Sequence, residues 1–594
     1  MRSRAGLMAA LSGVLALHCG GESSSVADKH GAGGTAGSQH AGQGGSTGSA
    51  RGGSAGCVDC AAGESSVGGR GGSGVSGGGG AGKSQAGASS GGSSGGGTAG
   101  GAGAGRGGVA GAGGTAGSRA GNSPGGRTTG GSAGSSSAGA AGESGSSSLT
   151  LGKVAIYQAV EIPLMVDGVE REANSNAPLI GGREALLRVW LEPGAGFAPH
   201  EIAAQVTVTA GSATRTTRSV FTVSGASTDA DLTSTLNFDL LANEVTGTST
   251  VSVVLSEDTT NAEPLARWPA SGARELEAQS SNGAFRITLV PLTANGFTPD
   301  TSETIRQRFE RYMADLFPAS SVTVTVVAPM PLVYDVNPDG TGWDEALDQL
   351  LELRDDDNVD ENVYYYGLLT PGATFDDYCR GDCVVGLSNV AGRTQEQYRG
   401  SIGTGYFETS KDTFSQETMA HELGHALGRE HSPCGTSDGE WAFPYKTGGI
   451  GVFGYNGTRL LDPGKYTDVM GYCVPVWISD YTYDHIFDRI AYVNGLASRS
   501  TAARRIENKE HRILRVGIDG RLAWGRDVAV SADDDAELAS LDLLDVSGRV
   551  VRTITAPFAP FDHLPGGFLS VPLDALAEQE VARVRLGGRT LDVR

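Results

Sequence analysis

The sequence is poor in aromatic residues and in basic charge, and after residue 17 it has no apolar run long enough to cross a bilayer. Phe, Trp and Tyr make up 6% of the 594 residues, and 45 basic side chains face 67 acidic ones, for a net charge of -22. Residues 149–594 hold 36 of the basic and 62 of the acidic side chains. Such an acidic surface disfavours nucleic acid and anionic membranes, so we expect no nucleic-acid partner.

The scarcity of aromatic residues is most marked over residues 20–148, where Gly, Ser, Ala and Thr dominate. Residues 21–148 contain 48 of the 93 glycines of the chain. A stretch of this composition cannot bury a core, so we predict a disordered linker that acts as a tether. Cys57 and Cys60 lie inside it, and we expect them to form a local disulfide or to remain free thiols.

A short apolar run precedes this linker. Two arginines and then apolar residues over 5–17 are typical of a secretory signal peptide, which we place at residues 1–19. The ending LALHC resembles a bacterial lipobox, which implies that Cys19 carries lipid and that the protein is held at the outer membrane or cell surface. His18 stands where Gly or Ala is usual, so plain secretion is the alternative.

Histidine is also scarce, but 3 of the 10 histidines gather in the stretch TMAHELGHALGREHSPCG. His421 and His425 are four residues apart, so on a helix both rings leave the same face. Glu422 lies beside that face. Gly428 can take a left-handed conformation that ends the helix and returns His431 to the other two rings. The pattern HExxHxxGxxH is typical of a Zn²⁺ site with three histidine ligands and a position left open for water.

The surrounding residues favour a helix. Thr413 and Gln416 are spaced as a capping box, so we predict a helix from there to about Leu427. Met419 and Leu423 repeat at helical spacing on the side opposite the histidines. One side of this helix is therefore expected to pack against a core while the other binds metal.

The segment HELGHALGREH resembles the zinc signature of the metzincin metalloproteases, and YTDVMGYC (466–473) lies where that family has its methionine turn. The resemblance implies that Met470 forms an apolar floor under the zinc ligands. It also implies that Tyr472 reaches the metal or the oxyanion, as a tyrosine does in some metzincins.

These residues predict an exported zinc-dependent endopeptidase that hydrolyses peptide bonds in extracellular proteins with one Zn²⁺ ion. Glu422 would act as the general base and Tyr472 as a donor to the oxyanion. The substrate is expected to lie extended along an edge strand near residues 384–391. We expect the protein to be a monomer with protein or peptide substrates.

The alternative is a surface-tethered binding or adhesion protein whose peptidase domain is vestigial. The loop CRGDC, which looks like an integrin-binding loop, belongs to this alternative. A vestigial peptidase is expected to lose its base or a metal ligand, whereas Glu422 and all three histidines are present.

The fold class predicted is α+β. Residues 149–284 show short β-rich runs separated by turn residues, which favours a β-sandwich-like domain. Residues 285–497 alternate strands with helices, including helices at 303–316 and near 343–354, and resemble the twisted mixed sheet with helices of a metzincin catalytic domain. Residues 498–594 return to strands, including a hairpin at Ser547–Gly548, and predict a small β-sandwich.

Four cysteines fall in the predicted catalytic domain. Cys434 stands three residues after the third histidine and Cys473 three residues after Met470, so we predict a disulfide between them if both elements converge on the metal. Cys379 and Cys383 would then close a tight loop. The alternative is a crossed arrangement that joins one of this second pair to one of the first.

The segment DVNPDGTGWDEA (335–346) nearly fits a calcium loop. Its twelfth position is Ala346 instead of Glu, and Pro338 disturbs the loop. An Asx-type turn that caps the following helix is therefore the favoured interpretation, with a Ca²⁺ ion as the alternative.

Overall fold

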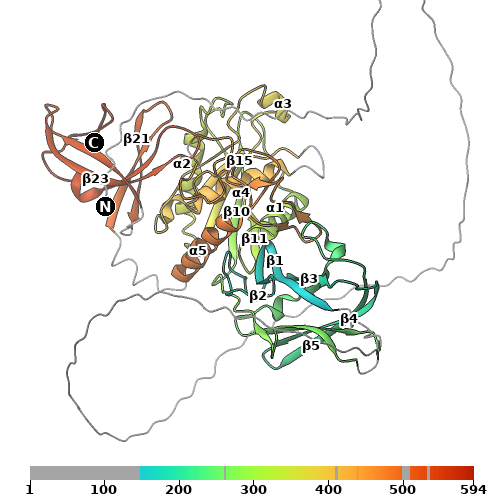
Figure 1. The fold of residues 1–594 in the computed structure, drawn as a ribbon. Helices are drawn as coiled ribbons and strands as arrows, with labels where there is room; N and C mark the ends of the chain where they lie inside the picture. Colours follow the sequence, from blue (N-terminus) through green and yellow to red (C-terminus); the bar gives the residue numbers. More distant parts are fainter. Residues whose placement is uncertain (1–147, 260–261, 408–412, 438, 498–508, 531–535) are drawn as a thin grey trace, which may run out of the picture. The chain divides into compact units, whose positions relative to one another are not determined.

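The computed structural model describes residues 148–594 except 260–261, 408–412, 438, 498–508 and 531–535. The predicted signal peptide and linker, with Cys19, Cys57 and Cys60, lie outside the described residues. The described part combines several sheets with helices, which confirms the α+β class (Figure 1). None of its helices is both long enough and apolar enough to cross a membrane.

Two sheets that share one hydrophobic core form the N-terminal part. The first contains the strands β1 (Leu149–Val166), β3 (Ala185–Pro193) and β6 (Leu236–Leu240). The second contains the strands β4 (His200–Ala210), β5 (Ala213–Val223), β7 (Thr250–Glu257) and β8 (Pro264–Trp268). Buried and less buried residues alternate along β6 and β7, because one face of each strand meets the core and the other faces water. Strands β1 and β3 are instead buried on both faces.

A later part of the chain completes the first of these sheets. Strands β16 (Gly454–Tyr455) and β17 (Leu460–Leu461) extend it beyond β1 in the order β17-β16-β1-β3-β6. The indole nitrogen of Trp477 also donates to the backbone oxygen of Ala159, at 2.9 Å. The segment after the histidine cluster is thereby tied to β1.

The central sheet has the order β11-β10-β13-β15-β14. Its strands are β10 (Phe285–Thr293), β11 (Val322–Val326), β13 (Val363–Leu369), β14 (Gly386–Ser388) and β15 (Gly400–Thr404). All pairs are parallel except β14, which lies antiparallel to β15 at the end of the order. Every residue of β13 is buried because both faces of the sheet are covered.

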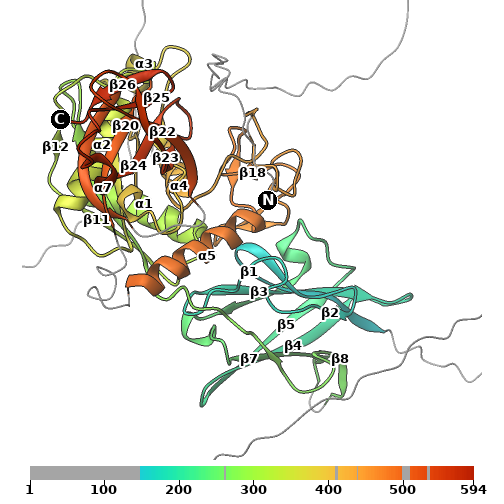
Figure 2. The ribbon, with the colours of Figure 1, turned by 90° about the vertical axis from the view of Figure 1, so that its left-hand side faces the viewer.

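Helices cover the two faces of this sheet. Helices α1 (Glu303–Leu316) and α4 (Phe414–Ala426) share a core with one face, and α2 (Trp343–Asp356) shares another core with the opposite face. The predicted helix at 303–316 is confirmed, and the histidine-bearing helix ends within a residue of its predicted limits. Helix α5 (Asp480–Ala497) runs close to β1 (Figure 2).

The predicted capping box at the start of α4 is wrong. Thr413 is the N-cap residue, but its side chain does not accept a bond from the helix backbone. Its hydroxyl donates instead to a carboxylate oxygen of Glu417, at 2.6 Å. The spacing of Thr413 and Gln416 satisfied the pattern, but Thr413 has φ -112° and ψ 0°, outside the extended region that capping requires.

The C-terminal strands form one antiparallel sheet with the order β21-β20-β24-β23-β22-β25-β26. The strands are β20 (Lys509–Val516), β21 (Leu522–Val530), β22 (Glu537–Leu544), β23 (Val550–Pro560), β24 (Gly567–Pro572), β25 (Arg583–Leu586) and β26 (Arg589–Asp592). The sheet is curled, so that its two end strands approach each other. The indole nitrogen of Trp524 on β21 donates to the backbone oxygen of Asp592 on β26, at 2.8 Å. The hairpin at Ser547–Gly548 is confirmed between β22 and β23.

This C-terminal sheet is packed closely against the part that carries α2. Phe561 and Phe568 belong to the same buried cluster as the apolar face of α2. Arg515 lies 2.7 Å from a carboxylate oxygen of Asp344 on that helix. The shared apolar core and this ion pair make the two parts one packed unit.

The segment 335–346 forms a turn over its first residues and enters α2 at Trp343. A side-chain oxygen of Asp339 accepts from the backbone nitrogen of Thr341, at 3.0 Å, which is an Asx turn. This turn does not cap α2, because the N-cap residue is Gly342 and no side-chain hydrogen bond caps the start of the helix. None of the groups of metal-ligating side chains found among the described residues includes this segment.

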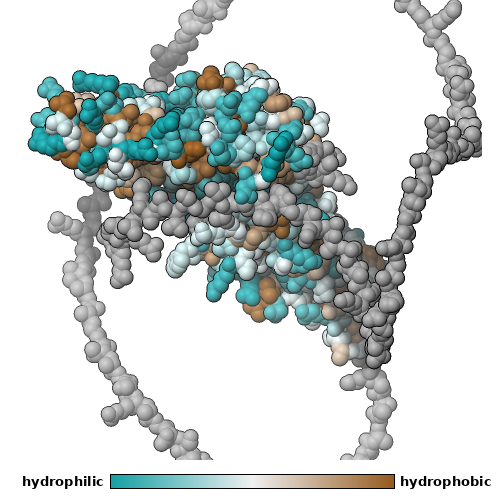
Figure 3. Space-filling view, turned by 90° about the horizontal axis from the view of Figure 1, so that it is seen from above, coloured by the Kyte–Doolittle hydropathy of each residue, from teal (hydrophilic) through white to brown (hydrophobic). Residues whose placement is uncertain are grey.

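The surface seen in Figure 3 carries hydrophobic side chains scattered among hydrophilic ones. The most exposed large apolar side chains, such as Trp441 at 98% and Val333 at 90%, lie far apart in the sequence. Isolated apolar residues of this kind are normal on a water-exposed surface.

Candidate metal centre

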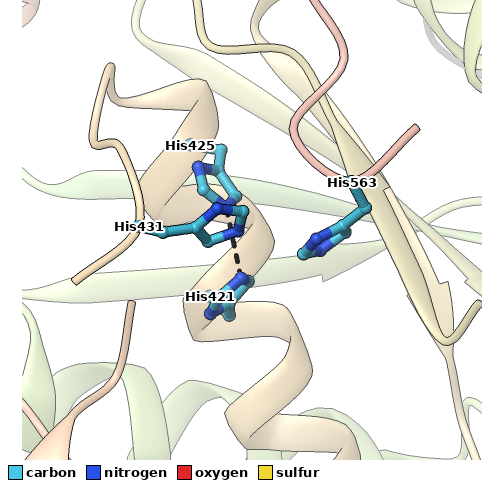
Figure 4. Close-up of side chains that lie close together, drawn as sticks. All are labelled: His421, His425, His431 and His563. Atoms are coloured by element: carbon cyan, nitrogen blue, oxygen red, sulfur yellow. Dashed lines mark hydrogen bonds between the residues drawn. The ribbon is translucent and has the colours of Figure 1, made fainter. Parts of the chain in front are cut away.

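Four of the ten histidines of the chain meet in one place. His421 and His425 project from α4, and their Nε2 atoms are 3.1 Å apart. His431 follows the helix, with its ring centre 4.7 Å from that of His425. His563 comes from the C-terminal sheet and faces the other three from the opposite side (Figure 4). One ligand atom from each lies within 4.8 Å of the others.

Backbone carbonyls fix the orientation of two rings. The Nδ1 atom of His421 lies 2.7 Å from the backbone oxygen of Val469, and that of His425 lies 2.6 Å from the backbone oxygen of Arg429. A carbonyl only accepts, so each Nδ1 carries the proton and each Nε2 presents a lone pair. This is the arrangement that metal-binding histidines adopt.

The donor set fits a metal ion. Two histidine nitrogens bound to one tetrahedral ion are about 3.3 Å apart, close to the separation of the two Nε2 atoms on α4. Burial lowers the pKa of His421 well below its usual value, and burial and the neighbouring histidines lower that of His425 to about 3, against the pull of Asp562. Neutral imidazoles are what a metal requires, so this buried group could bind a metal ion.

Gly428 makes the turn between helix and third histidine. Its φ is 82°, in the left-handed region, and its backbone nitrogen donates to the oxygen of His425 at 2.7 Å. A side-chain carbon at this position would lie 3.0 Å from the backbone oxygen of Ala391. Both the conformation and the lack of space require glycine, as the sequence predicted.

Met470 lies directly beneath α4. Its side chain is buried, and its sulfur would be 2.3 Å from a side-chain carbon placed on Gly424, so the methionine fills the space that this glycine leaves. The turn is held by Asp468, whose carboxylate accepts from the backbone nitrogens of Met470 at 2.9 Å and Ser479 at 2.8 Å. Sequence reasoning did not single out Asp468.

The side chain of Glu422, on α4, is buried against the edge strand β14. A side-chain carbon on Gly386 of β14 would lie 2.0 Å from Glu422 Oε1, so the absence of a side chain there makes room for the carboxylate. Burial raises the pKa of Glu422 well above its usual value, and the neighbouring Asp562 raises it further. The carboxylate therefore holds a proton more readily than an exposed glutamate does.

Tyr472 reaches the cluster, as expected. Its hydroxyl lies 2.7 Å from Nε2 of His431 and also contacts Nδ1 of His563. The structure thus brings Glu422, Tyr472 and the three predicted histidines together above Met470.

Asp562 and His563 are the residues of the site that sequence reasoning missed. Nε2 of His563 lies 3.1 Å from Glu422 Oε1 and 3.0 Å from Asp562 Oδ2, and the latter oxygen is 3.4 Å from Nε2 of His425. Despite its burial, His563 and His425 lower the pKa of Asp562. Neither spacing nor a motif connects Asp562 to α4; the only signal was an adjacent Asp-His pair before the turn sequence LPGG.

Both predicted disulfides are present. Cys434 and Cys473 are joined, as are Cys379 and Cys383, and in each pair the Cα atoms are 5.7 Å apart. The crossed arrangement is therefore excluded in this structure. The first bridge ties the loop that follows His431 to the turn that contains Met470, while the second closes a short loop elsewhere.

The contact between α4 and Met470 predicts the effect of adding one methyl group. The higher helix propensity of alanine in Gly424→Ala should stabilise the folded protein by about 1 kcal/mol. The added methyl group also displaces the side chain of Met470, and such overpacking destabilises the folded protein by roughly 1–3 kcal/mol. We expect a net loss of unfolding free energy in urea denaturation. In a Met470→Ala background the methyl group has room, so the same substitution should be neutral or stabilising. An equal loss in both backgrounds would contradict this packing.

The two disulfides close loops of different length, so their removal should destabilise the protein by different amounts. Replacing Cys434 and Cys473 by Ser opens a loop of 39 residues, which the chain-entropy model values at about 4 kcal/mol. The matched control, with Cys379 and Cys383 replaced, opens a loop of 4 and should cost about 2 kcal/mol. Only the first variant should also bind metal more weakly, measured by competition with a chromophoric chelator. Equal metal affinity in the two variants would show that the first bridge does not position His431.

Comparison with known proteins adds no name to this site. No protein-family model matches the sequence, and no curated protein matches it significantly. The description of the site therefore rests on its geometry. Three histidines, two of them with fixed tautomers, lie beside a buried glutamate and a tyrosine and above a methionine, and this group could bind a metal ion.

Proposed function

We propose that the protein is a zinc-dependent endopeptidase of the metzincin type. The observation that carries this proposal is the convergence of His421, His425 and His431 with the carboxylate of Glu422 beside them. The order of strands and helices in the central sheet, the antiparallel edge strand β14 and the methionine under α4 also support it. Three nitrogen ligands of this kind suit Zn²⁺ and leave a position for the reaction.

The three histidines would hold the ion, and Met470 would form the apolar floor below them. When bound, Zn²⁺ supplies a Lewis acid that polarises a peptide carbonyl and acidifies water. Glu422 would take a proton from the attacking water and deliver it to the leaving amine. The raised pKa of Glu422 suits this exchange, because a carboxylate both accepts and releases a proton readily when its pKa lies closer to the working pH.

Tyr472 is placed to stabilise negative charge on the carbonyl oxygen. Its hydroxyl lies 2.7 Å from a nitrogen of His431, so it can donate to an oxygen held beside the ligands. The substrate would lie extended along β14, because an edge strand offers unpaired backbone groups to a peptide.

The two disulfides indicate an oxidising environment. With the signal-like residues 1–19, they support export, and the LALHC sequence supports lipid attachment at Cys19. Proteins and peptides outside the cell are therefore the proposed substrates.

The first test separates the base from the ligands. Glu422→Ala should keep bound zinc and the thermal unfolding midpoint while peptide hydrolysis falls by several orders of magnitude. Hydrolysis is measured by mass spectrometry on a mixed peptide library, and bound zinc by elemental analysis. Loss of zinc together with activity would make Glu422 a structural residue. An adhesion protein would show no chelator-sensitive cleavage in any variant.

The second test concerns the tyrosine. Tyr472→Phe should lower kcat by roughly 10- to 1000-fold with little change in KM, because the hydroxyl acts on charge that develops only in the transition state. Tyr466→Phe, on the same turn segment but outside the histidine cluster, is the control and should leave both constants unchanged. An unchanged kcat for the first variant would limit Tyr472 to packing.

A further inference from the structure

The edge of the central sheet is already paired with another segment of the same chain. The backbone nitrogen of Val390 donates to the oxygen of Pro560 at 3.0 Å, and that of Asp562 donates to the oxygen of Ser388 at 3.2 Å. Asn389 and Phe561 are thereby antiparallel partners. Residues 560–562 thus bind the edge as an extended peptide would.

Side chains strengthen this pairing and carry it to the histidines. A carboxylate oxygen of Asp562 accepts from the backbone nitrogen of Ser388 at 3.0 Å, and its other oxygen faces His425. The side chain of Asp562 is fully shielded, at 0% exposure. His563, the next residue, contacts both Glu422 and Tyr472, the two groups proposed to act on a substrate.

The turn after His563 is built for this position. Gly566 has φ 111° and Gly567 has φ 145°, conformations that other residues rarely adopt. A side-chain carbon on Gly566 would lie 2.2 Å from the backbone oxygen of Val516, and one on Gly567 would lie 2.4 Å from that of Ala559. Two glycines therefore allow the chain to enter the site and return to β24.

The cavity beside the histidines is lined by both the sheet edge and the segment paired with it. A cavity of about 510 Å³ borders His425 and His431, and its wall includes residues 390–392 together with residues 560–562. The segment that forms part of this wall stands where a peptide paired with residues 388–390 would have to lie. The same backbone groups cannot serve both at once.

We infer that residues 560–563 are an internal occupant of the substrate groove, with His563 in the coordination position that a hydrolytic site keeps open, so that the protein rests in a latent form. This inference rests on the proposed peptidase function for its consequence, while the occupancy itself rests on the contacts described above. A metal with four histidine donors has the closed coordination of a structural site. Peptide hydrolysis then requires the segment to leave the groove.

A catalytic role for the same residues is the competing explanation. His563 touches Glu422 and Tyr472, so it could assist the reaction directly. The two explanations predict opposite signs, because loss of an occupant raises the rate whereas loss of a catalytic group lowers it.

The experiment compares His563→Ala and Asp562→Ala with wild type in the full chain. His511→Ala is the matched control, because His511 is the only other histidine between residues 498 and 594 and lies outside the cluster. Each protein is loaded with Co²⁺, and its visible absorption is recorded. Hydrogen exchange is followed at residues 386–392, and hydrolysis is measured on a mixed peptide library.

For His563→Ala we expect an altered Co²⁺ spectrum with the metal stoichiometry unchanged, and for both variants faster exchange at Val390. Hydrolysis should rise roughly tenfold or more if the groove is open in less than a tenth of wild-type molecules. The control should match wild type in all three measurements. Wild-type spectra and wild-type or lower hydrolysis in His563→Ala would overturn the inference while leaving the peptidase function in place. Changed spectra and exchange without hydrolysis in any variant would support the occupancy and refute the proposed function.

Discussion

The site depends on hydrogen bonds that two backbone carbonyls accept. The oxygens of Val469 and Arg429 hold the Nδ1 atoms of His421 and His425, and so decide that both Nε2 atoms face the same point. The two carbonyls come from different places, one from the turn before Met470 and one from the turn after α4. The geometry of these metal-ligating nitrogens therefore depends on the position of both turns, which the disulfide between Cys434 and Cys473 joins.

The sequence predicted what depends on local spacing. The helix of His421 and His425, the left-handed Gly428 and the pairing of the four cysteines are confirmed, because each follows from positions that lie close along the chain or on one recognised motif. The capping box failed because Thr413 is not in an extended conformation. Residue spacing can suggest such a cap but does not determine the backbone angles.

What the sequence could not predict depends on contacts between distant segments. Strand β16 joins the sheet of β1 across about 300 residues, and no periodic pattern marks that pairing. Asp562 and His563 reach Glu422 from a sheet whose strands carry no recognisable site. Their arrival depends on the packing of the C-terminal sheet against α2, which is a tertiary property. In a site assembled from two packed parts, a sequence motif therefore predicts only the residues that lie within the motif itself.

The most direct test of the account is X-ray absorption at the zinc edge on the full chain as purified. Four histidines around one ion predict a first shell of nitrogen atoms only, at about 2.0–2.1 Å, with the outer-shell scattering typical of imidazole rings. Loss of one imidazole contribution is expected when His563 is replaced. A shell containing sulfur at about 2.3 Å, or no bound zinc, would contradict the assignment of the metal to this histidine cluster.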